Sequence, residues 1–274
     1  MTELVVRRLL IDLTAPFPAR WNGGDAFSSA FFNALSMSFP AGEQFFIDSV
    51  RDGLKALPEG KRALLAAEVQ GFIGQEATHR RIHALFNGHL DQLGFDNWIE
   101  RNASKRRQAH VGDDLRNQVA ATAATEHFTA IFADWLMRSP QVLQAAEPRL
   151  RTLWQWHCAE ESEHRNTAFD MYQALGGNHH WRIRVFRYIT FTFLLDVARQ
   201  TLRNLRHDGS LYCWSTWRSA ARLLFARDGM IRSNYQLWRD YFATDFHPRQ
   251  HPAKLSQQWL RDNSAQFTVV GQPT

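Results

Sequence analysis

The chain has 274 residues, of which 45% are hydrophobic, and it carries a formal net charge of +5. This length and composition predict one folded domain with a sizeable core and exclude a largely disordered chain. The two cysteines, Cys158 and Cys213, form no paired motif. A disulfide-stapled secreted domain is therefore excluded, and a reducing compartment is expected.

The positive charge is concentrated late in the chain. Residues 178–240 contain eleven Arg and four Asp, without any nucleic-acid-binding motif, so no nucleic-acid partner is expected. A solvated helix face is favoured over contact with acidic lipid. The N-terminus does not read as a signal peptide, and the apolar run 188–198 is too short to span a bilayer. The sequence thus predicts a soluble, cytoplasmic protein, with peripheral membrane contact as the less favoured alternative.

Glycines and prolines divide the chain into segments. Residues 1–25 are expected to be irregular, because Pro and Gly recur in them. A helical pattern begins near Asp25 and is interrupted at Pro40. Since proline is well tolerated in a first helical turn, a separate helix is predicted from Pro40 to about Leu57.

Longer helices follow. Helical patterns bounded by Gly and Pro are predicted over 61–93, 114–137 and 148–175. Residues 94–113 are polar and mixed, and no helix is predicted there.

The last hundred residues predict two or three helices within 180–244 and a short one near 254–263. The expected fold is all-α: a ferritin-like four-helix bundle with additional C-terminal helices. We predict a single domain, 1–274, whose metal-binding core is 25–177 and whose C-terminal extension, 178–274, packs on that core.

A repeated carboxylate and histidine pattern carries the chemistry. Each half of the chain has a lone Glu followed, 33 or 35 residues later, by Glu-x-x-His: Glu43 with Glu76 and His79, then Glu126 with Glu161 and His164. Side chains three residues apart share one face of a helix, so each motif can direct both of its groups to one point in a bundle core. Four carboxylates and two imidazoles can hold two metal ions.

Further residues lie near these motifs. His157 is four residues before Glu161 and is predicted to be a seventh ligand. His83, four residues after His79, is a possible additional ligand or a partner of one. Glu160 also falls within reach of the cluster, although the register of the first half favours Glu161.

Other neighbours receive supporting roles. His127 follows Glu126 directly, points about a quarter-turn away and is interpreted as structural. Asp48, Asp134 and Asp170 are candidates for orienting the ligating histidines. No nucleophile elbow, P-loop or H-E-x-x-H motif occurs.

The segments FIGQEATHRRIH, ATEHFTAIFADWL and LWQWHCAEESEHRNTAFDMY resemble the bacterial family of predicted metal-dependent hydrolases over roughly residues 25–245. The ligand pattern is also similar to that of ferritin-like di-iron oxygenases, particularly the arylamine N-oxygenases. Those enzymes have an added His four residues before the Glu of the last motif, the place that His157 holds here. The resemblance implies this ligand set: Glu43, Glu76, His79, Glu126, His157, Glu161 and His164.

The expected function is a dinuclear metal enzyme, with Fe/Fe or Mn/Fe favoured and Mn or Zn as alternatives. It would activate dioxygen, with an electron donor, to oxidise a small apolar or aromatic substrate. A metal-dependent hydrolase using a metal-bridging water is the alternative, as the family resemblance implies. Non-enzymatic iron binding or storage is the second alternative, and a homodimer remains open.

Overall fold

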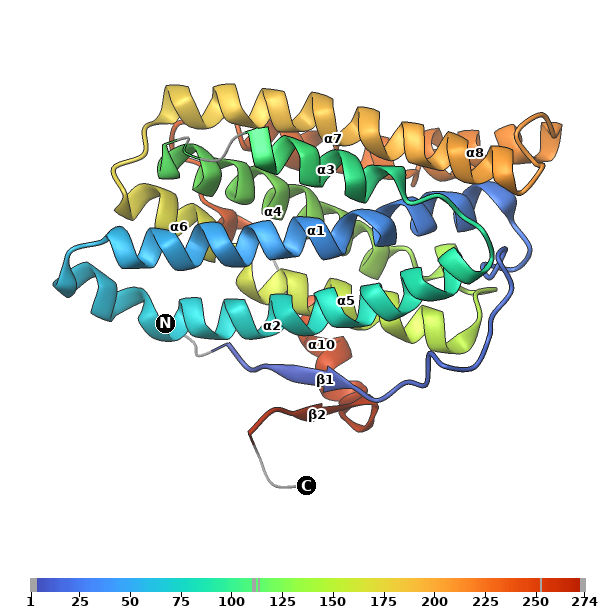
Figure 1. Cartoon of the computed structure of the whole chain (residues 1–274), viewed down its shortest axis with the longest axis horizontal. Coiled ribbons are helices and arrows are strands. Elements are labelled where there is room, and N and C mark those ends of the chain that lie inside the picture. The colour runs from blue at the N-terminus through green and yellow to red at the C-terminus, as the bar shows by residue number, and fades with distance from the viewer. Residues whose placement is uncertain (1–3, 110–111, 113, 252, 272–274) are drawn as a thin grey trace.

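The computed structural model describes residues 4–109, 112, 114–251 and 253–271, and its fold is all-α (Figure 1). The helices are α1 Ala26–Ala56, α2 Glu59–Gln92, α3 Trp98–Ala109, α4 Leu115–Arg138, α5 Pro148–His164, α6 Thr167–Ala174, α7 His179–His207, α8 Trp214–Phe225, α9 Met230–Asp240 and α10 Lys254–Asp262. Short 3₁₀ turns occupy Pro140–Val142, Pro248–Gln250 and Ser264–Gln266.

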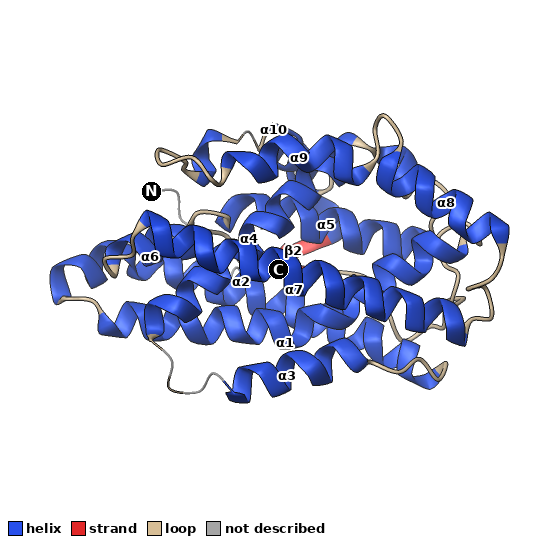
Figure 2. Ribbon diagram, turned by 90° about the horizontal axis from the view of Figure 1, so that it is seen from above, coloured by secondary structure: helices blue, strands red, loops and turns tan. Residues whose placement is uncertain are grey.

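The helices form layers around α1 and α4. Helix α1 packs against α2, α4 and α7, and α4 also packs against α5, α6 and α9. In Figure 1, α7 lies across the top, α1 runs through the middle, and α2 and α5 lie below. Seen from above, α3 lies along one edge of the molecule, and α8 and α9 lie along the opposite edge (Figure 2). The helices that carry the predicted ligands are therefore neighbours, while the ferritin-like relationship stays a prediction.

Helix α1 runs through Pro40 without interruption, so the prediction of a separate helix starting there was wrong. Proline lacks the N–H that would donate to the carbonyl of Ser36, one turn earlier. The side-chain amide of Asn87, on α2, donates to that carbonyl instead, at 2.9 Å. A tertiary contact thus satisfies the backbone group that proline leaves free.

Helix α3 was not predicted. Its sequence is mostly polar, but Ile99 is buried and its backbone N–H donates to Oε1 of Gln200 on α7. Arg106 forms an ion pair with the buried carboxylate of Asp196. Packing on α1 and these polar contacts with α7, rather than a strong apolar stripe, hold this helix in place.

The predicted helix over 148–175 is two helices, because α5 ends at His164 and α6 begins at Thr167. No Gly or Pro marks the interruption, and the apolar pattern continues across it. The hydroxyl of Thr167 donates to Glu68 of α2 at 3.0 Å, which fixes the start of α6.

The N-terminal segment, predicted to be irregular, contains strand β1 Arg7–Leu9. It pairs antiparallel with β2 Phe267–Val269, and Arg7 lies opposite Val269. Both strands lie below α2 and α5 in Figure 1, away from α7. The strands bring the two ends of the described chain together beside the helices of the predicted site.

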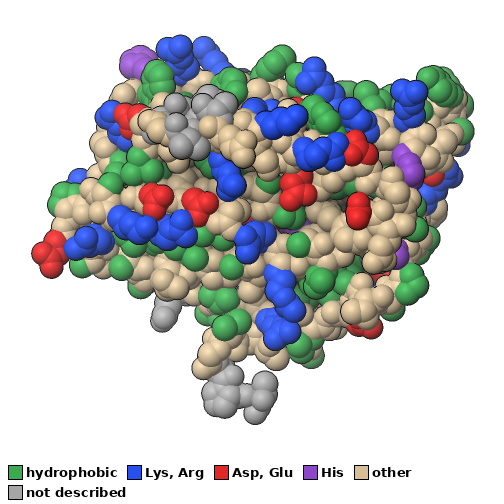
Figure 3. Space-filling view, viewed as in Figure 1, with side chains coloured by type: hydrophobic (Ala, Val, Ile, Leu, Met, Phe, Trp, Pro, Cys, Tyr) green, Lys and Arg blue, Asp and Glu red, His purple; other side chains and the backbone are tan. Residues whose placement is uncertain are grey.

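The surface and the core differ sharply in composition. Figure 3 shows basic and acidic side chains interspersed over the face formed by α1, α2, α3 and α7. Two apolar clusters fill the interior, one around Trp154 and Phe32 and the other around Phe72 and Phe186. Within the described residues, no helix is both long and apolar enough to cross a bilayer.

Candidate metal centre

Four helices bring the seven predicted ligands together in the interior. Their positions are Glu43 on α1, Glu76 and His79 on α2, Glu126 on α4, and His157, Glu161 and His164 on α5. None is more than 3% exposed.

Two overlapping groups of donor atoms have metal-ligand proximity. In each group the donor atoms lie within 4.8 Å of one another, and both groups contain His79. The larger group is Glu76, His79, Glu161 and His164; the smaller is Glu43, His79 and His157.

Glu161 lies at the middle of the cluster. Its Oε1 lies 2.9 Å from Nε2 of His157, 3.5 Å from Nδ1 of His79 and 3.9 Å from Nε2 of His164. Glu126 joins the cluster through His164, whose Nδ1 lies 3.0 Å from Oε2 of Glu126. On the other side of the same ring, Nε2 lies 3.3 Å from Oε1 of Glu76.

Several buried carboxylate oxygens in the cluster have no hydrogen-bond partner among the described residues. These are both oxygens of Glu43, both of Glu76, Oε1 of Glu126 and Oε2 of Glu161. A buried carboxylate is costly unless a cation or hydrogen-bond donors compensate it. Oxygen and imidazole nitrogen donors that face one another at these distances suit transition-metal ions.

The electrostatics point in the same direction. Burial, reinforced by neighbouring carboxylates, raises the pKa values of Glu43 and Glu76 well above the ordinary range. Burial also raises the pKa of Glu126 to about 7. Burial opposes ionisation of Glu161 too, but the charge of His164 holds its pKa well below the usual value. So many carboxylates can be ionised together only if positive charge lies among them.

An ion pair orients His79. Its Nε2 lies 2.9 Å from Oε2 of Glu160, and Oε1 of Glu160 accepts from Arg7 at 3.0 Å. Arg7 also donates to Glu163 at 2.7 Å. In the neutral form of the ring, which a metal ligand requires, Nε2 donates to Glu160 and Nδ1 has its lone pair on the side of Glu161. Glu160 therefore lies outside both donor groups and positions a predicted ligand.

A chain of neutral groups orients His157. Its Nδ1 lies 2.7 Å from Nε2 of His83, and Nδ1 of His83 lies 2.9 Å from the hydroxyl of Ser36. That hydroxyl donates to Oδ1 of Asn87 at 2.8 Å. Like Glu160, His83 lies outside both donor groups, next to a predicted ligand.

The direction of this chain follows from Asn87. Its carbonyl oxygen only accepts, so Ser36 donates to it and accepts from Nδ1–H of His83. Nε2 of His83 then accepts from Nδ1–H of His157. The remaining nitrogen of His157, Nε2, presents a lone pair to a Glu161 oxygen 2.9 Å away. Two electron-rich atoms so close need a cation between them. Because burial and the charge of His79 lower the pKa of His157 to about 4, a metal ion suits this place better than a proton.

The aspartates do not orient the histidines as predicted. Asp48 pairs with Arg51 and Asp134 with Arg138 at the surface, and Asp170 pairs with His247 and Arg249. All three carboxylates pair with nearby arginines and not with a histidine of the cluster.

His127 faces away from the cluster, as its position on the helix predicted. Its Nε2 donates to the backbone carbonyl of Leu237, 3.0 Å away on α9. Burial lowers the pKa of this imidazole to about 3, so the ring is neutral and structural.

Three supporting residues escaped the sequence analysis: Arg7, Ser36 and Asn87. The spacing in the sequence could have indicated two of them. Asn87 is four residues after His83, and Ser36 is seven residues before Glu43, so each lies on the same helix face as a candidate site residue. Arg7 carried none, because nothing in the sequence places the N-terminal strand beside α5.

The fold and the site define an all-α protein with a buried Glu/His cluster able to hold metal ions. A family model described as predicted metal-dependent hydrolase matches residues 5–252, and the chain belongs to this family. No curated protein and no solved structure matches the chain. The similarity to ferritin-like oxygenases stays a prediction.

Proposed function

We propose that the seven-residue cluster holds two transition-metal ions and that the protein is a metal-dependent hydrolase. The observation that carries the metal pair is the lone pair of His157 facing Glu161, in a cluster whose other carboxylate oxygens lack donors. The family description makes hydrolysis the favoured reaction over the oxidation expected from the ligand pattern.

The ligands divide into two halves around Glu161. His164, Glu76 and Glu126 lie on one side, and His157 and Glu43 lie on the other. His79 belongs to both donor groups. This division would provide enough donors for two ions, and Oε1 of Glu161 lies near a histidine on each side, His157 and His164.

A bound metal pair lowers the pKa of a water and polarises the oxygen of an ester or phosphate. The chain supplies the surroundings for that chemistry. Phe39 packs on His157 and Trp156 packs on His79, with ring centroids 4.7 and 5.0 Å apart. These rings keep bulk water from the ligands, while Glu160 and His83 hold two imidazoles in one orientation.

Oxidation by dioxygen with an electron donor is the second candidate. The donor set itself favours it, because four carboxylates with histidines on four helices are typical of di-iron and di-manganese carboxylate proteins. Iron storage is the third, and a small oligomer in solution would argue against it.

Metal analysis combined with anomalous diffraction at the iron, manganese and zinc edges tests the centre. We expect two sites about 3–4 Å apart, and loss of metal in Glu76→Gln but not in Glu59→Gln, an exposed glutamate of the same helix. Absence of stoichiometric metal, or equal metal in both variants, would overturn the proposal.

Activity assays then separate the reactions. Esters and phosphoesters are tested with manganese- and zinc-loaded protein, and oxygen consumption is tested with the ferrous protein and a reductant. Hydrolysis that disappears in Glu76→Gln supports the favoured reaction. Oxygen consumption without hydrolysis supports the second candidate and refutes the first.

A further inference from the structure

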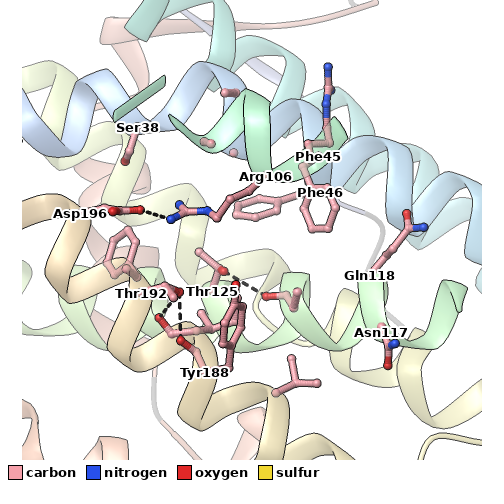
Figure 4. A pocket seen from close by; sticks show the side chains of 18 of the residues that line it. Ser38, Phe45, Phe46, Arg106, Asn117, Gln118, Thr125, Tyr188, Thr192 and Asp196 are labelled. Carbon is pink, nitrogen blue, oxygen red and sulfur yellow. Dashed lines mark hydrogen bonds and ion pairs between the residues drawn. The ribbon is translucent and has the colours of Figure 1, made fainter. Parts of the chain in front are cut away.

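A deep apolar pocket of about 420 Å³ lies between α1, α3, α4 and α7. Figure 4 shows Phe45 and Phe46 of α1 on one side and Tyr188 and Thr192 of α7 across from them. This size falls within the range of small-molecule sites.

A second pocket of about 250 Å³ adjoins the first, since Phe39, Thr129 and Phe193 line both. Along α4 the two linings extend from Asn117 to Phe132. The fifteen rises of 1.5 Å between these two residues span about 22 Å. The two adjoining pockets, together called the slot, match an extended chain better than a compact ring.

Polar side chains line the first pocket at the start of α4 and, on the opposite side, at the Arg106–Asp196 ion pair (Figure 4). Asn117, Gln118 and Arg184 line the end at the start of α4 (Figure 4 shows the first two). Arg184 lies over the ring of Trp181, 5.1 Å from its centroid, and no carboxylate among the described residues pairs with it. At the other end the lining is almost wholly apolar, with Phe31 and Ile131 among its members.

Charge at the slot favours an anion. The charged lining residues are Arg106, Arg107, Arg184 and Asp196, and Asp196 is already paired with Arg106. Arg107 pairs with Asp48 at 3.7 Å, and Asp48 also pairs with Arg51. Among the described residues, Arg184 is thus the lining arginine without a carboxylate partner, and it can attract a negatively charged group.

The slot passes close to the metal centre near its middle. The ring of Phe39 lines both pockets, and its centroid lies 4.7 Å from that of His157. Gly42 and Thr125, which also line the slot, directly precede the predicted ligands Glu43 and Glu126. One phenyl ring therefore separates the slot from a predicted ligand.

We propose that this slot binds an amphiphile with a long unbranched alkyl chain and an anionic head. The head lies near Arg184 and the chain extends past Phe39 into the second pocket. Such a molecule is the substrate class of the metal centre, a step that rests on the proposed function. Free alkyl carboxylates and acyl thioesters with a phosphorylated head share this chemistry.

Calorimetric binding to the full chain tests the slot, with metal-loaded and chelator-treated protein in parallel. The probes are n-alkyl carboxylates of increasing length below their micellar concentrations, the matching alcohols, and acyl-coenzyme A. We expect Kd to fall about fourfold per added methylene until the slot is full. Tighter binding of the carboxylate or of the thioester identifies the source, whereas affinity independent of chain length overturns the proposal.

Two sets of variants locate the site. Ala121→Phe and Ala103→Phe fill the slot from α4 and α3 and should weaken binding about tenfold or more, while the exposed Ala67→Phe on α2 should not. Arg184→Gln should weaken the carboxylates about three- to fivefold and leave the alcohols unchanged, with the exposed Arg206→Gln of the same helix as control. Thermal melting checks folding, and unaltered binding in folded slot variants overturns the proposal.

The experiments can refute the proposal for the slot and the proposal for the metal centre independently of each other. Chain-length-dependent binding in chelated protein supports the slot even if every activity assay is negative. Metal-dependent turnover only of short substrates, with no binding of long chains, supports the proposed function and refutes the slot.

Discussion

Removing the Arg7 side chain should weaken both the fold and the metal centre. Arg7 is 11% exposed and pairs with Glu160, which is fully buried, and with Glu163, which is 22% exposed. In Arg7→Met, Glu163 keeps the amide of Gln75 at 2.8 Å. Glu160 keeps only His79 and becomes a buried carboxylate without its guanidinium.

The size of the effect follows from this burial. Exposed ion pairs contribute about 0–1 kcal/mol, but removing one partner of a buried pair costs roughly 3–5 kcal/mol. Because Arg7 is slightly exposed, we expect the lower end, about 3 kcal/mol less free energy of unfolding. For a chain of this size that corresponds to a fall in Tm of roughly 6–12 °C. Looser orientation of His79 should weaken metal binding roughly 10- to 100-fold.

Thermal and urea unfolding of chelated protein measures the stability, and competition with a chromogenic chelator measures the metal affinity. Arg8→Met is the matched control, since Arg8 is the exposed neighbour on the same strand, and it should change stability by less than about 0.5 kcal/mol. Equal effects of the two variants would refute the reasoning. So would a double variant, Arg7→Met with Glu160→Gln, that is no more stable than Arg7→Met, because the double variant leaves no uncompensated charge.

Three further changes test other parts of the structure. Asn87→Leu should lower the free energy of unfolding by about 1–3 kcal/mol, because the Ser36 carbonyl loses its donor, and should weaken metal binding about tenfold or more; unchanged values in both assays would contradict the relay. Gly71→Ala should destabilise in urea melts, because a methyl group would meet the N-terminal segment at 2.5 Å, whereas Gly88→Ala, which meets nothing within 4 Å, should stabilise by about 1 kcal/mol. Burial lowers the pKa of His251 in the folded protein, so below the ordinary pKa near 6.5 the unfolded chain binds a proton that the folded chain does not. The stability that the neutral imidazole contributes is therefore present above about pH 6.5 and is lost as pH falls toward the lower pKa of the folded state. His251→Phe should flatten the pH dependence of Tm below about pH 6.5.

The predicted ligands could be identified from the sequence because their geometry is local. Glu76 and His79 share a helix face at any register of packing, and so do His157, Glu161 and His164. The sequence analysis therefore placed all seven residues, and the structure brings all seven into one buried cluster. The roles of Glu160 and His83 remained open because both also lie within reach of ligand faces, and only the partners across the helices decide them.

The features that the sequence did not predict depend on contacts between distant segments. Helix α1 continues through Pro40 because Asn87, 47 residues later, supplies the missing donor. Helix α3 is held by packing on α1 and by contacts with Asp196 and Gln200 of α7. The strand at Arg7 needs the other end of the chain to pair with. In each case local propensity pointed away from the observed structure, and a tertiary contact outweighed it.

The two halves of the chain repeat the ligand motif but not its surroundings. The position four residues before the motif glutamate is Phe72 in the first half and His157 in the second. Each ring packs on the histidine of the other motif, Phe72 on His164 at 5.1 Å and His157 on His79 at 4.3 Å. The shared packing role explains how a histidine can replace a phenyl ring there without disturbing the core.

The two halves also differ at the position just before each motif glutamate. Glu160 accepts from His79, but its counterpart Gln75 donates to Val5 and Glu163 instead. Among the described residues, His164 consequently has no carboxylate partner outside the predicted ligand cluster and contacts Glu126 within it. A carboxylate that accepts from one nitrogen of an imidazole makes the other nitrogen a stronger metal ligand. The neutral chain of His83, Ser36 and Asn87 behind His157 has a smaller effect of this kind. The near-symmetric sequence repeat thus builds a centre whose histidine donors are electronically unequal.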